Sequence, residues 1–191
     1  MQDIINIYYK NKIGKCISWG SDHTVYDYDK DKVIKFSLVD FLINSHNKTL
    51  DDYAVCKRYF GDYLLDTTFA HSENHKFFVG IQEKVFGHYL SKEDLIHEGI
   101  KQQFKEIMDA CNRMTREGYG EIDLLGSGGV FRSKLSNIFV TSNNQLKIID
   151  SSVWRLKGQY FNPVRYIFLF IVRPIALWQQ NKIIKEFNKL C

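Results

Sequence analysis

Apolar and polar residues alternate in short runs over the first third of the chain, and this pattern predicts a sheet of short strands. The predicted strands cover residues 13–19, 24–28, 33–36 and 77–85. A single helix is expected over 50–60, where Gly61 supplies a stop signal. The first part of the chain therefore combines several strands with one helix.

A different pattern follows in the second half of the chain. Apolar residues recur at helical spacing over 93–117, which predicts a long helix that ends at Gly118. Two short apolar runs, 137–140 and 146–150, flank the polar turn 142–144 and predict a β-hairpin.

These elements predict an α+β fold with two parts. Residues 1–87 would form an antiparallel sheet with one helix, and residues 88–191 a reduced, mainly helical part. The chain is 45% hydrophobic and 25% charged, which is ordinary for a globular protein, so a packed core is expected.

The cysteines and the N-terminal residues indicate a reducing compartment. The four cysteines are far apart and form no CxxC pair, so we expect buried thiols rather than disulfides or a zinc site. His71 and His75 are four residues apart but have no cysteine or acid cluster beside them. No basic segment followed by an apolar one opens the chain, so a cytoplasmic location is predicted, with a possible peripheral place at the inner face of the membrane.

Three residues form a candidate site for a nucleotide and a cation. Lys35 lies among Val33, Ile34 and Phe36, where a buried ammonium group needs an anionic partner; an exposed lysine on an edge strand is the alternative. Asp150 ends an apolar strand and Asn137 opens the strand before it, so a hairpin would bring their oxygens together for Mg²⁺. Turn residues with no ligand are the alternative.

A candidate catalytic base lies just after the long helix. Asp123 follows the segment Gly118–Ile122, in a position where a carboxylate could accept or orient a hydroxyl proton. Glu121 is the nearest competitor, and a loop acid without such a role is the alternative.

The order of these segments resembles the protein-kinase-like superfamily. The segments are IGKCISWGSDHTVY, VIKF, IQEKVFG, DLLG, LSNIFV and LKIID, and they cover residues 13 to about 152. The chain is most similar to the small atypical bacterial kinase-like and aminoglycoside-phosphotransferase-like branches, with a truncated C-terminal lobe.

The resemblance implies a site for ATP and Mg²⁺. It implies that 14–26 is a strand-loop-strand over the phosphates, that Lys35 pairs with them, and that 83–85 is a hinge for adenine. Asp123 would be the catalytic-loop aspartate, and the metal ligands would be Asn137 and Asp150. The implied nucleotide-site residues are Gly14, Gly20, Ser21, Val33, Lys35, Asp52, Glu83 and Val85.

The chain also departs from the family pattern. It has no GxGxxG and no His-Arg-Asp, and Asp150-Ser151-Ser152 replaces Asp-Phe-Gly. Asp123 and Asn137 are separated by an insertion over 126–136, in which Arg132 and Lys134 could contact phosphate or a charged acceptor or could be solvated. The predicted helix 50–60 lacks a glutamate, so Asp52, or else Asp51, must pair with Lys35.

The last 41 residues are basic and aromatic. Residues 151–191 contain seven lysines and arginines and one acid, so this segment carries +6 while the whole chain carries +4. The tail 155–191 could bind an anionic membrane surface or a partner protein, or be a solvated helix face. The apolar run 166–178 is too short for a transmembrane span, and a core helix is the favoured interpretation over an interfacial segment or an oligomer face.

Three hypotheses therefore remain. The first is an ATP-dependent phosphotransferase acting on a hydroxyl acceptor, such as a small molecule, a sugar- or lipid-linked compound or a protein. The second is a pseudokinase, a nucleotide-binding scaffold without efficient catalysis. The third is a basic module for a nucleic acid or a membrane; no RNA-binding signature is present, so no specific nucleic acid is expected.

Overall fold

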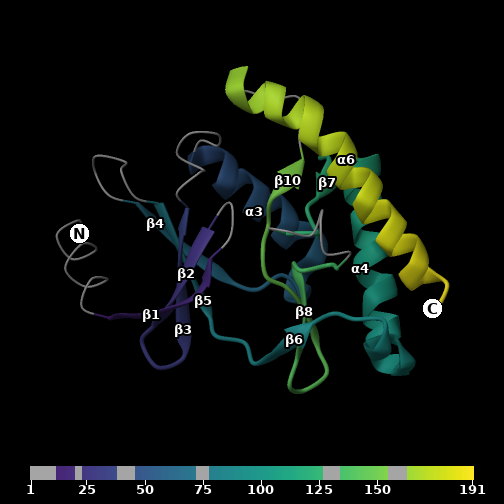
Figure 1. The fold of residues 1–191 in the computed structure, drawn as a ribbon, viewed down its shortest axis with the longest axis horizontal. Helices are drawn as coiled ribbons and strands as arrows, with labels where there is room; N and C mark the ends of the chain where they lie inside the picture. Colours follow the sequence, from purple (N-terminus) through teal and green to yellow (C-terminus); the bar gives the residue numbers. More distant parts are fainter. Residues whose placement is uncertain (1–11, 20–22, 38–45, 72–77, 127–133, 155–162) are drawn as a thin grey trace. The chain divides into compact units, whose positions relative to one another are not determined.

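The chain has an α+β fold made of two compact units (Figure 1). The computed structural model describes residues 12–19, 23–37, 46–71, 78–126, 134–154 and 163–191. The first unit comprises residues 1–50 and 66–85, and the second comprises 51–65 and 86–191. The predicted division after residue 87 lies two residues from the break between residues 85 and 86, whereas residues 51–65 group with the second unit.

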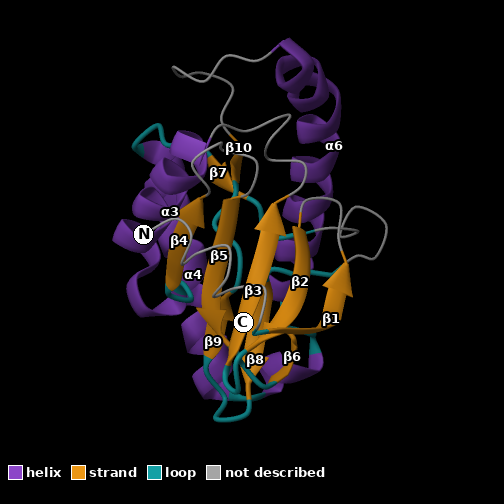
Figure 2. Ribbon diagram, turned by 90° about the vertical axis from the view of Figure 1, so that its left-hand side faces the viewer, coloured by secondary structure: helices purple, strands orange, loops and turns teal. Residues whose placement is uncertain are grey.

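An antiparallel sheet of five strands forms the first unit. The strands are β1 (Ile13–Trp19), β2 (His23–Tyr28), β3 (Lys32–Ser37), β4 (Thr67–His71) and β5 (Phe78–Glu83). Their order is β1-β2-β3-β5-β4, and Figure 2 shows them side by side. The structure confirms the four predicted strands and adds β4, which was not predicted.

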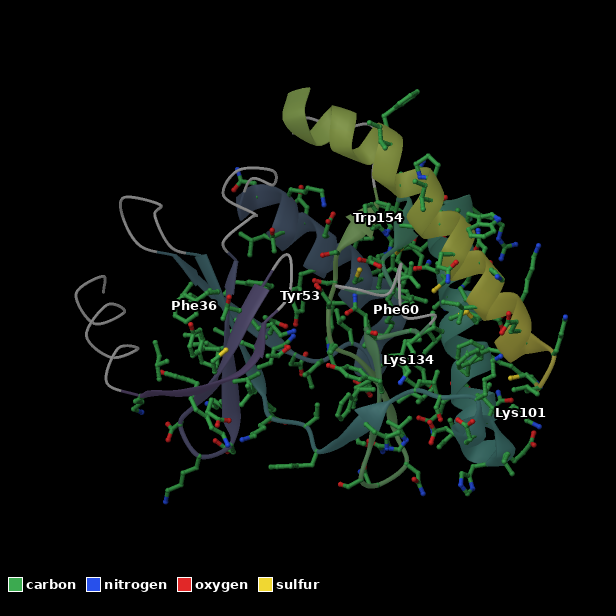
Figure 3. All side chains as sticks on the ribbon, in the orientation of Figure 1. Phe36, Tyr53, Phe60, Lys101, Lys134 and Trp154 are labelled. Carbon is green, nitrogen blue, oxygen red and sulfur yellow. The ribbon has the colours of Figure 1, made fainter. Side chains whose placement is uncertain are left out.

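Among the described residues, the core of this sheet is small. Its buried members are Tyr28, Ile34 and Val79, with partly buried residues around them. The ring of Phe36, which is labelled in Figure 3, meets Tyr26 edge-on, with the ring centroids 5.7 Å apart. Just after β5, the ammonium of Lys84 lies 2.5 Å from the carboxylate of Asp27 in β2.

Two of the helices and two short 3₁₀ turns come first in the second unit, and the first of these helices begins in the first unit. Helix α3 (His46–Phe60) starts four residues before its predicted beginning, and it ends at Gly61, where the 3₁₀ turn η1 (Gly61–Tyr63) begins. The predicted helix over 93–117 is divided into η2 (Glu93–Ile96) and α4 (Glu98–Arg116). His97 separates them because its backbone is extended, and Gly118 follows α4 with φ +83°.

A side-chain network fixes the entry to η2. The carboxylate of Asp94 accepts hydrogen bonds from the backbone and the hydroxyl of Ser91 and pairs with the ring of His88. Burial alone would raise the pKa of Asp94, but these hydrogen bonds outweigh it and lower the pKa.

Five short strands complete the second unit. β6 (Gly87–Tyr89), β8 (Ile138–Thr141) and β9 (Leu146–Ile148) form one sheet, and β7 (Glu121–Ile122) pairs with β10 (Val153–Trp154). The predicted hairpin is confirmed as β8–β9, and Asn137 and Asp150 lie just outside the ends of these strands. The other three strands were not predicted.

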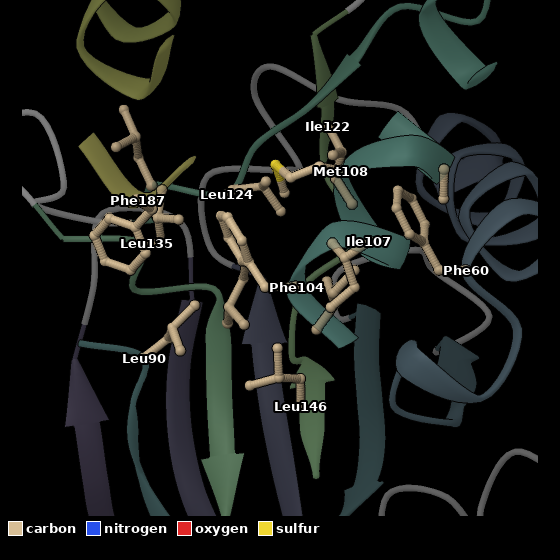
Figure 4. Packing of buried hydrophobic residues seen from close by; sticks show 14 of the residues in the cluster. Phe60, Leu90, Phe104, Ile107, Met108, Ile122, Leu124, Leu135, Leu146 and Phe187 are labelled. Atoms are coloured by element: carbon tan, nitrogen blue, oxygen red, sulfur yellow. The ribbon is translucent and has the colours of Figure 1, made fainter. Parts of the chain in front are cut away.

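The second unit has the larger hydrophobic core. Helix α4 inserts the fully buried Phe104 and Ile107 into it, and Phe60 of α3 and Leu146 of β9 also belong to it (Figure 4). Each buried aromatic or aliphatic side chain contributes about 1.5–3 kcal/mol. This core holds the segments that carry Asp123 and Asn137.

The last helix, α6 (Pro163–Asn188), packs its later part against that core. Ala176, Gln180, Ile183 and Phe187 are buried at the spacing of one helix face. The prediction of a core helix over 166–178 is wrong for several of its side chains, because Phe170, Ile171, Ile175 and Trp178 are exposed. Within the described part of the chain, no helix has the length and apolar character needed to cross a membrane.

All four cysteines are thiols rather than disulfides. Cys56 is buried as predicted, and burial raises the pKa of the Cys111 thiol to about 12. The expectation of burial is wrong for Cys16, which is exposed on β1 because its strand lies at the sheet edge.

Candidate functional site

The predicted lysine lies in the first unit, in the middle of the sheet. Lys35 of β3 is half-buried and is paired with Val25 of β2 and Gly80 of β5. Two positions earlier, Val33 is buried. A lysine on a central strand is held by ladders on both sides, so its position is well defined, and the edge-strand alternative is wrong.

The other predicted nucleotide-site residues of this unit lie at its edges. Gly14 is exposed on β1, and Gly20 and Ser21 lie outside the described residues. Glu83 is exposed at the end of β5, and Val85 is half-buried two residues later. The predicted hinge is thus the short segment in which the first unit ends.

In the second unit, backbone hydrogen bonds join the three segments that carry Asp123, Asn137 and Asp150. The N–H of Asp123 donates to the carbonyl of Ser152 at 2.8 Å. The side-chain amide of Asn137 donates to the carbonyl of Asp123 at 2.8 Å, and the N–H of Ile149 donates to the carbonyl of Asn137 at 3.0 Å. We call these three residues the Asp-Asn-Asp cluster.

Two backbone hydrogen bonds bring Asn137 back beside the Asp123 segment in spite of the 14-residue spacing. The N–H of Asn137 donates to the carbonyl of Leu124 at 3.1 Å, and the N–H of Ser136 donates to that of Leu125 at 3.2 Å. The insertion therefore leaves and re-enters the site at neighbouring points. Its first residue, Gly126, and its exposed Lys134 are described (Figure 3), whereas Arg132 lies outside the described residues.

The carboxylate of Asp123 is held by the turn that it starts. Its Oδ1 accepts hydrogen bonds from the N–H groups of Leu125 at 2.9 Å and of Gly126 at 3.2 Å. Asp123 is only 9% exposed. Two backbone donors stabilise a carboxylate in its charged form and fix its direction.

The amide of Asn137 is equally constrained. Its Nδ2 donates a hydrogen bond to the carbonyl of Asp123. Its Oδ1 therefore lies on the opposite side of the amide group, beside Gly126. A Cβ at Gly126 would lie 2.5 Å from that oxygen, and Gly126 has φ +65°. Only glycine fits both the backbone angle and the space beside the amide oxygen.

This donor set fits a magnesium ion. Asp150 is half-buried at the end of the hairpin, and the hydroxyl of Ser152 lies 3.4 Å from its Oδ1. A carboxylate and an amide oxygen are hard ligands that Mg²⁺ accepts, and Mg²⁺ keeps several waters or phosphate oxygens as well. Among the described residues there is no cluster of three or more His, Cys, Asp or Glu. The described residues therefore do not indicate a metal ion that is coordinated by protein side chains alone.

Helix α3 anchors the segment after Asp150. The buried Asp52 accepts a hydrogen bond from the N–H of Val153 at 3.2 Å, and the thiol of Cys56 lies 3.5 Å from the carbonyl of Ser151. Asp52 was predicted to pair with Lys35, and that pairing stays a prediction. Its contact with Val153 was missed, because nothing in the local sequence distinguishes the buried Asp52 from its neighbour Asp51.

Two residues of α6 position the catalytic-loop candidates, and neither was predicted. The side-chain amide of Gln180 bridges the N–H of Leu124 at 2.8 Å and the carbonyl of Ile122 at 3.0 Å. Arg173 forms an ion pair with Glu121 at 2.7 Å. This pairing gives Glu121 a structural role, so Asp123 is the better candidate base of the two.

Comparison with known proteins adds no family to this description. No protein-family model matches the chain, and no curated protein matches its sequence. The site is therefore argued from its own geometry.

Substituting Gly126→Ala is expected to damage the cluster, because the new methyl group would clash with the Asn137 amide. The positive φ alone costs about 1–2 kcal/mol, and the clash adds to it. Gly61→Ala is the matched control, since Gly61 has φ +52° but nothing within 4 Å of an added Cβ. Chemical denaturation should show a larger loss for Gly126→Ala than for Gly61→Ala. Equal losses would mean that the Gly126–Asn137 contact does not constrain the site.

Proposed function

We propose that this chain is an ATP- and Mg²⁺-dependent phosphotransferase with a protein-kinase-like fold, acting on a hydroxyl acceptor. The observation that carries the proposal is the Asp-Asn-Asp cluster, in which backbone and amide hydrogen bonds join three separate segments. Phosphoryl transfer requires a base, oxygen ligands for magnesium and a cation for the phosphates. The cluster supplies the first two, and Lys35 supplies the third.

The order of elements also supports this proposal. In protein kinases, the phosphate-binding lysine lies on the third strand, a helix follows, and the catalytic aspartate, the asparagine and the metal-binding aspartate come in that order. Here Lys35 lies on β3, α3 follows it, and Asp123, Asn137 and Asp150 come in the same order. The ladder between residues 124–125 and 136–137 accounts for the unusual spacing, because the insertion is set aside from the loop.

The described residues divide the chemistry among themselves. Asp123, oriented by two N–H groups, would accept the proton of the acceptor hydroxyl while the hydroxyl oxygen forms a bond to the γ-phosphorus. The bond from that phosphorus to the bridging oxygen breaks, and ADP leaves. Lys35 would neutralise charge on the α- and β-phosphates. Asn137 and Asp150 would hold magnesium, which shields the phosphate charge when it is bound.

A nucleotide-binding module without transfer is the second candidate. Its support is the sequence Asp150-Ser151-Ser152, which lacks the phenylalanine and glycine of the kinase motif. In this candidate the same ligands bind ATP, but Asp123 has no role in chemistry. The two candidates differ in turnover and not in binding.

Thermal unfolding with ATP and Mg²⁺ tests the nucleotide site. A ligand at 100 times its Kd stabilises the folded state by about 2.7 kcal/mol, so the melting temperature should rise with ATP concentration. Lys35→Met should reduce this rise strongly, whereas Lys30→Met, at an exposed turn, should not. The absence of any shift at millimolar ATP with Mg²⁺ would contradict both candidate functions.

A further inference from the structure

Helix α6 carries a second functional feature, which does not depend on nucleotide binding. Its buried face consists of Ala176, Gln180, Ile183 and Phe187. At about 100° of rotation per residue, a second set of residues lies more than about 100° around the helix from the centre of this face. It comprises Ile171, Ile175, Trp178, Lys182, Lys185 and Lys189, and all six are exposed. We call this stripe the outer face of α6.

The first half of the outer face is apolar. Ile171 is 59% exposed, Ile175 is 53% exposed and Trp178 is 64% exposed, and the neighbouring Phe170 is 68% exposed. Large apolar side chains gathered on one helix face are costly to leave in water, and such patches mark interaction sites. An occupant of this half must therefore be apolar.

The second half of the outer face is basic. Lys182, Lys185 and Lys189 follow one another on the same stripe, and the ammonium of Lys182 lies 5.5 Å from the ring centre of Trp178. The nearby acid Glu186 is paired with Lys92, which lowers the pKa of Glu186 and compensates its charge. An occupant of this half must be anionic.

We infer that the outer face of α6 binds the surface of an anionic lipid bilayer. A bilayer offers apolar chains directly beneath a negatively charged headgroup layer, which matches both halves of the face. Tryptophan favours the boundary between these layers, and lysine stems can lie along it while their ammonium groups reach the headgroups.

A second copy of this chain fits the outer face less well. An antiparallel pairing of two α6 helices would place the lysines of one copy over the isoleucines of the other, which would desolvate ammonium groups without a partner. A parallel pairing would place lysines against lysines. Charge and apolarity together therefore favour the bilayer over self-association.

Co-sedimentation with vesicles tests this inference. The wild-type chain should bind vesicles that contain phosphatidylglycerol, bind phosphatidylcholine vesicles much less, and lose binding as salt increases. Each lysine near such a surface adds about fivefold to binding, so Lys182→Glu with Lys185→Glu should weaken binding at least about 25-fold. Lys15→Glu with Lys30→Glu, at exposed positions of the first unit, is the charge-matched control and should have a much smaller effect.

A second variant tests the apolar half. Ile175→Ser with Trp178→Ser should weaken vesicle binding about tenfold or more while leaving the melting temperature nearly unchanged, because both side chains are exposed. The inference would be overturned if the wild-type chain did not bind anionic vesicles, or if both α6 variants bound them as well as the wild type. It would also be overturned if sedimentation velocity showed a dimer that Ile175→Ser with Trp178→Ser dissociates, since the face would then be a contact between copies.

Discussion

Asp123→Asn is expected to lower phosphoryl transfer by about 10²–10⁴-fold, the usual contribution of a positioned general base. Asparagine has the same shape and keeps an oxygen that can accept the two N–H hydrogen bonds from Leu125 and Gly126. The turn should therefore survive, and only the capacity to take a proton is lost. Turnover is measured as ADP release with candidate hydroxyl acceptors and with water.

Two controls make the Asp123 result specific. ATP binding, measured by the melting-temperature shift, should stay within about threefold of the wild type, because in the proposed function Asp123 acts on the acceptor rather than on the nucleotide. Glu121→Gln would break the ion pair with Arg173 and should lower turnover far less. If Asp123→Asn retained full turnover while Glu121→Gln lost it, the base would have been assigned to the wrong residue. A wild-type chain that binds ATP but never turns it over would favour the nucleotide-binding module.

Asp150→Ala is expected to remove most of the magnesium dependence of ATP binding. Loss of a supporting residue around a metal typically costs 10–100-fold in affinity, so loss of a direct carboxylate ligand should cost about that much or more. Asp150 is half-buried and its Oδ1 lies 3.4 Å from the Ser152 hydroxyl, so unfolding without ligand is measured alongside to separate a loss of stability from the loss of the ion. The measurement is the ATP-induced melting shift over a magnesium titration.

The matched control for Asp150→Ala is Asp62→Ala. Asp62 is an exposed acid of the same unit, so the substitution changes the net charge equally. Asp62→Ala should leave the magnesium titration unchanged. An unaltered titration for Asp150→Ala would show that another residue holds the ion.

The local parts of the fold were predictable from the sequence. The alternation in β1 to β3 and the apolar spacing in α4 are set by neighbouring residues, and the turn at 142–144 indicates the β8–β9 hairpin. The same local signals pointed to Asn137 and Asp150, because both lie at the ends of that hairpin.

The missing parts depend on distant partners. β7 and β10 have two residues each, and they exist because Ile122 pairs with Val153 from another part of the chain. Two residues carry no periodic signal, so their pairing cannot be seen in the sequence. The contribution of Gln180 is hidden for the same reason, since its amide meets the backbone of a loop that is 56 residues away.

The direction in which α6 packs was also unpredictable. Its apolar run over 166–178 suggested a buried segment, but the residues of α6 that are buried in the described structure lie between Ala176 and Phe187. The apolar character of a segment does not indicate which side of the helix meets the core when apolar residues lie on more than one side.

In the proposed function, Lys35, Asn137 and Asp150 bind one magnesium–ATP complex. A crystal structure with Mg²⁺ and a non-hydrolysable ATP analogue would show whether they do. We expect the ion on the oxygens of Asn137 and Asp150 and the Lys35 ammonium on the α- and β-phosphates. An analogue bound elsewhere, or bound with Lys35 turned away from the phosphates and no ion at the Asn137–Asp150 pair, would contradict this expectation.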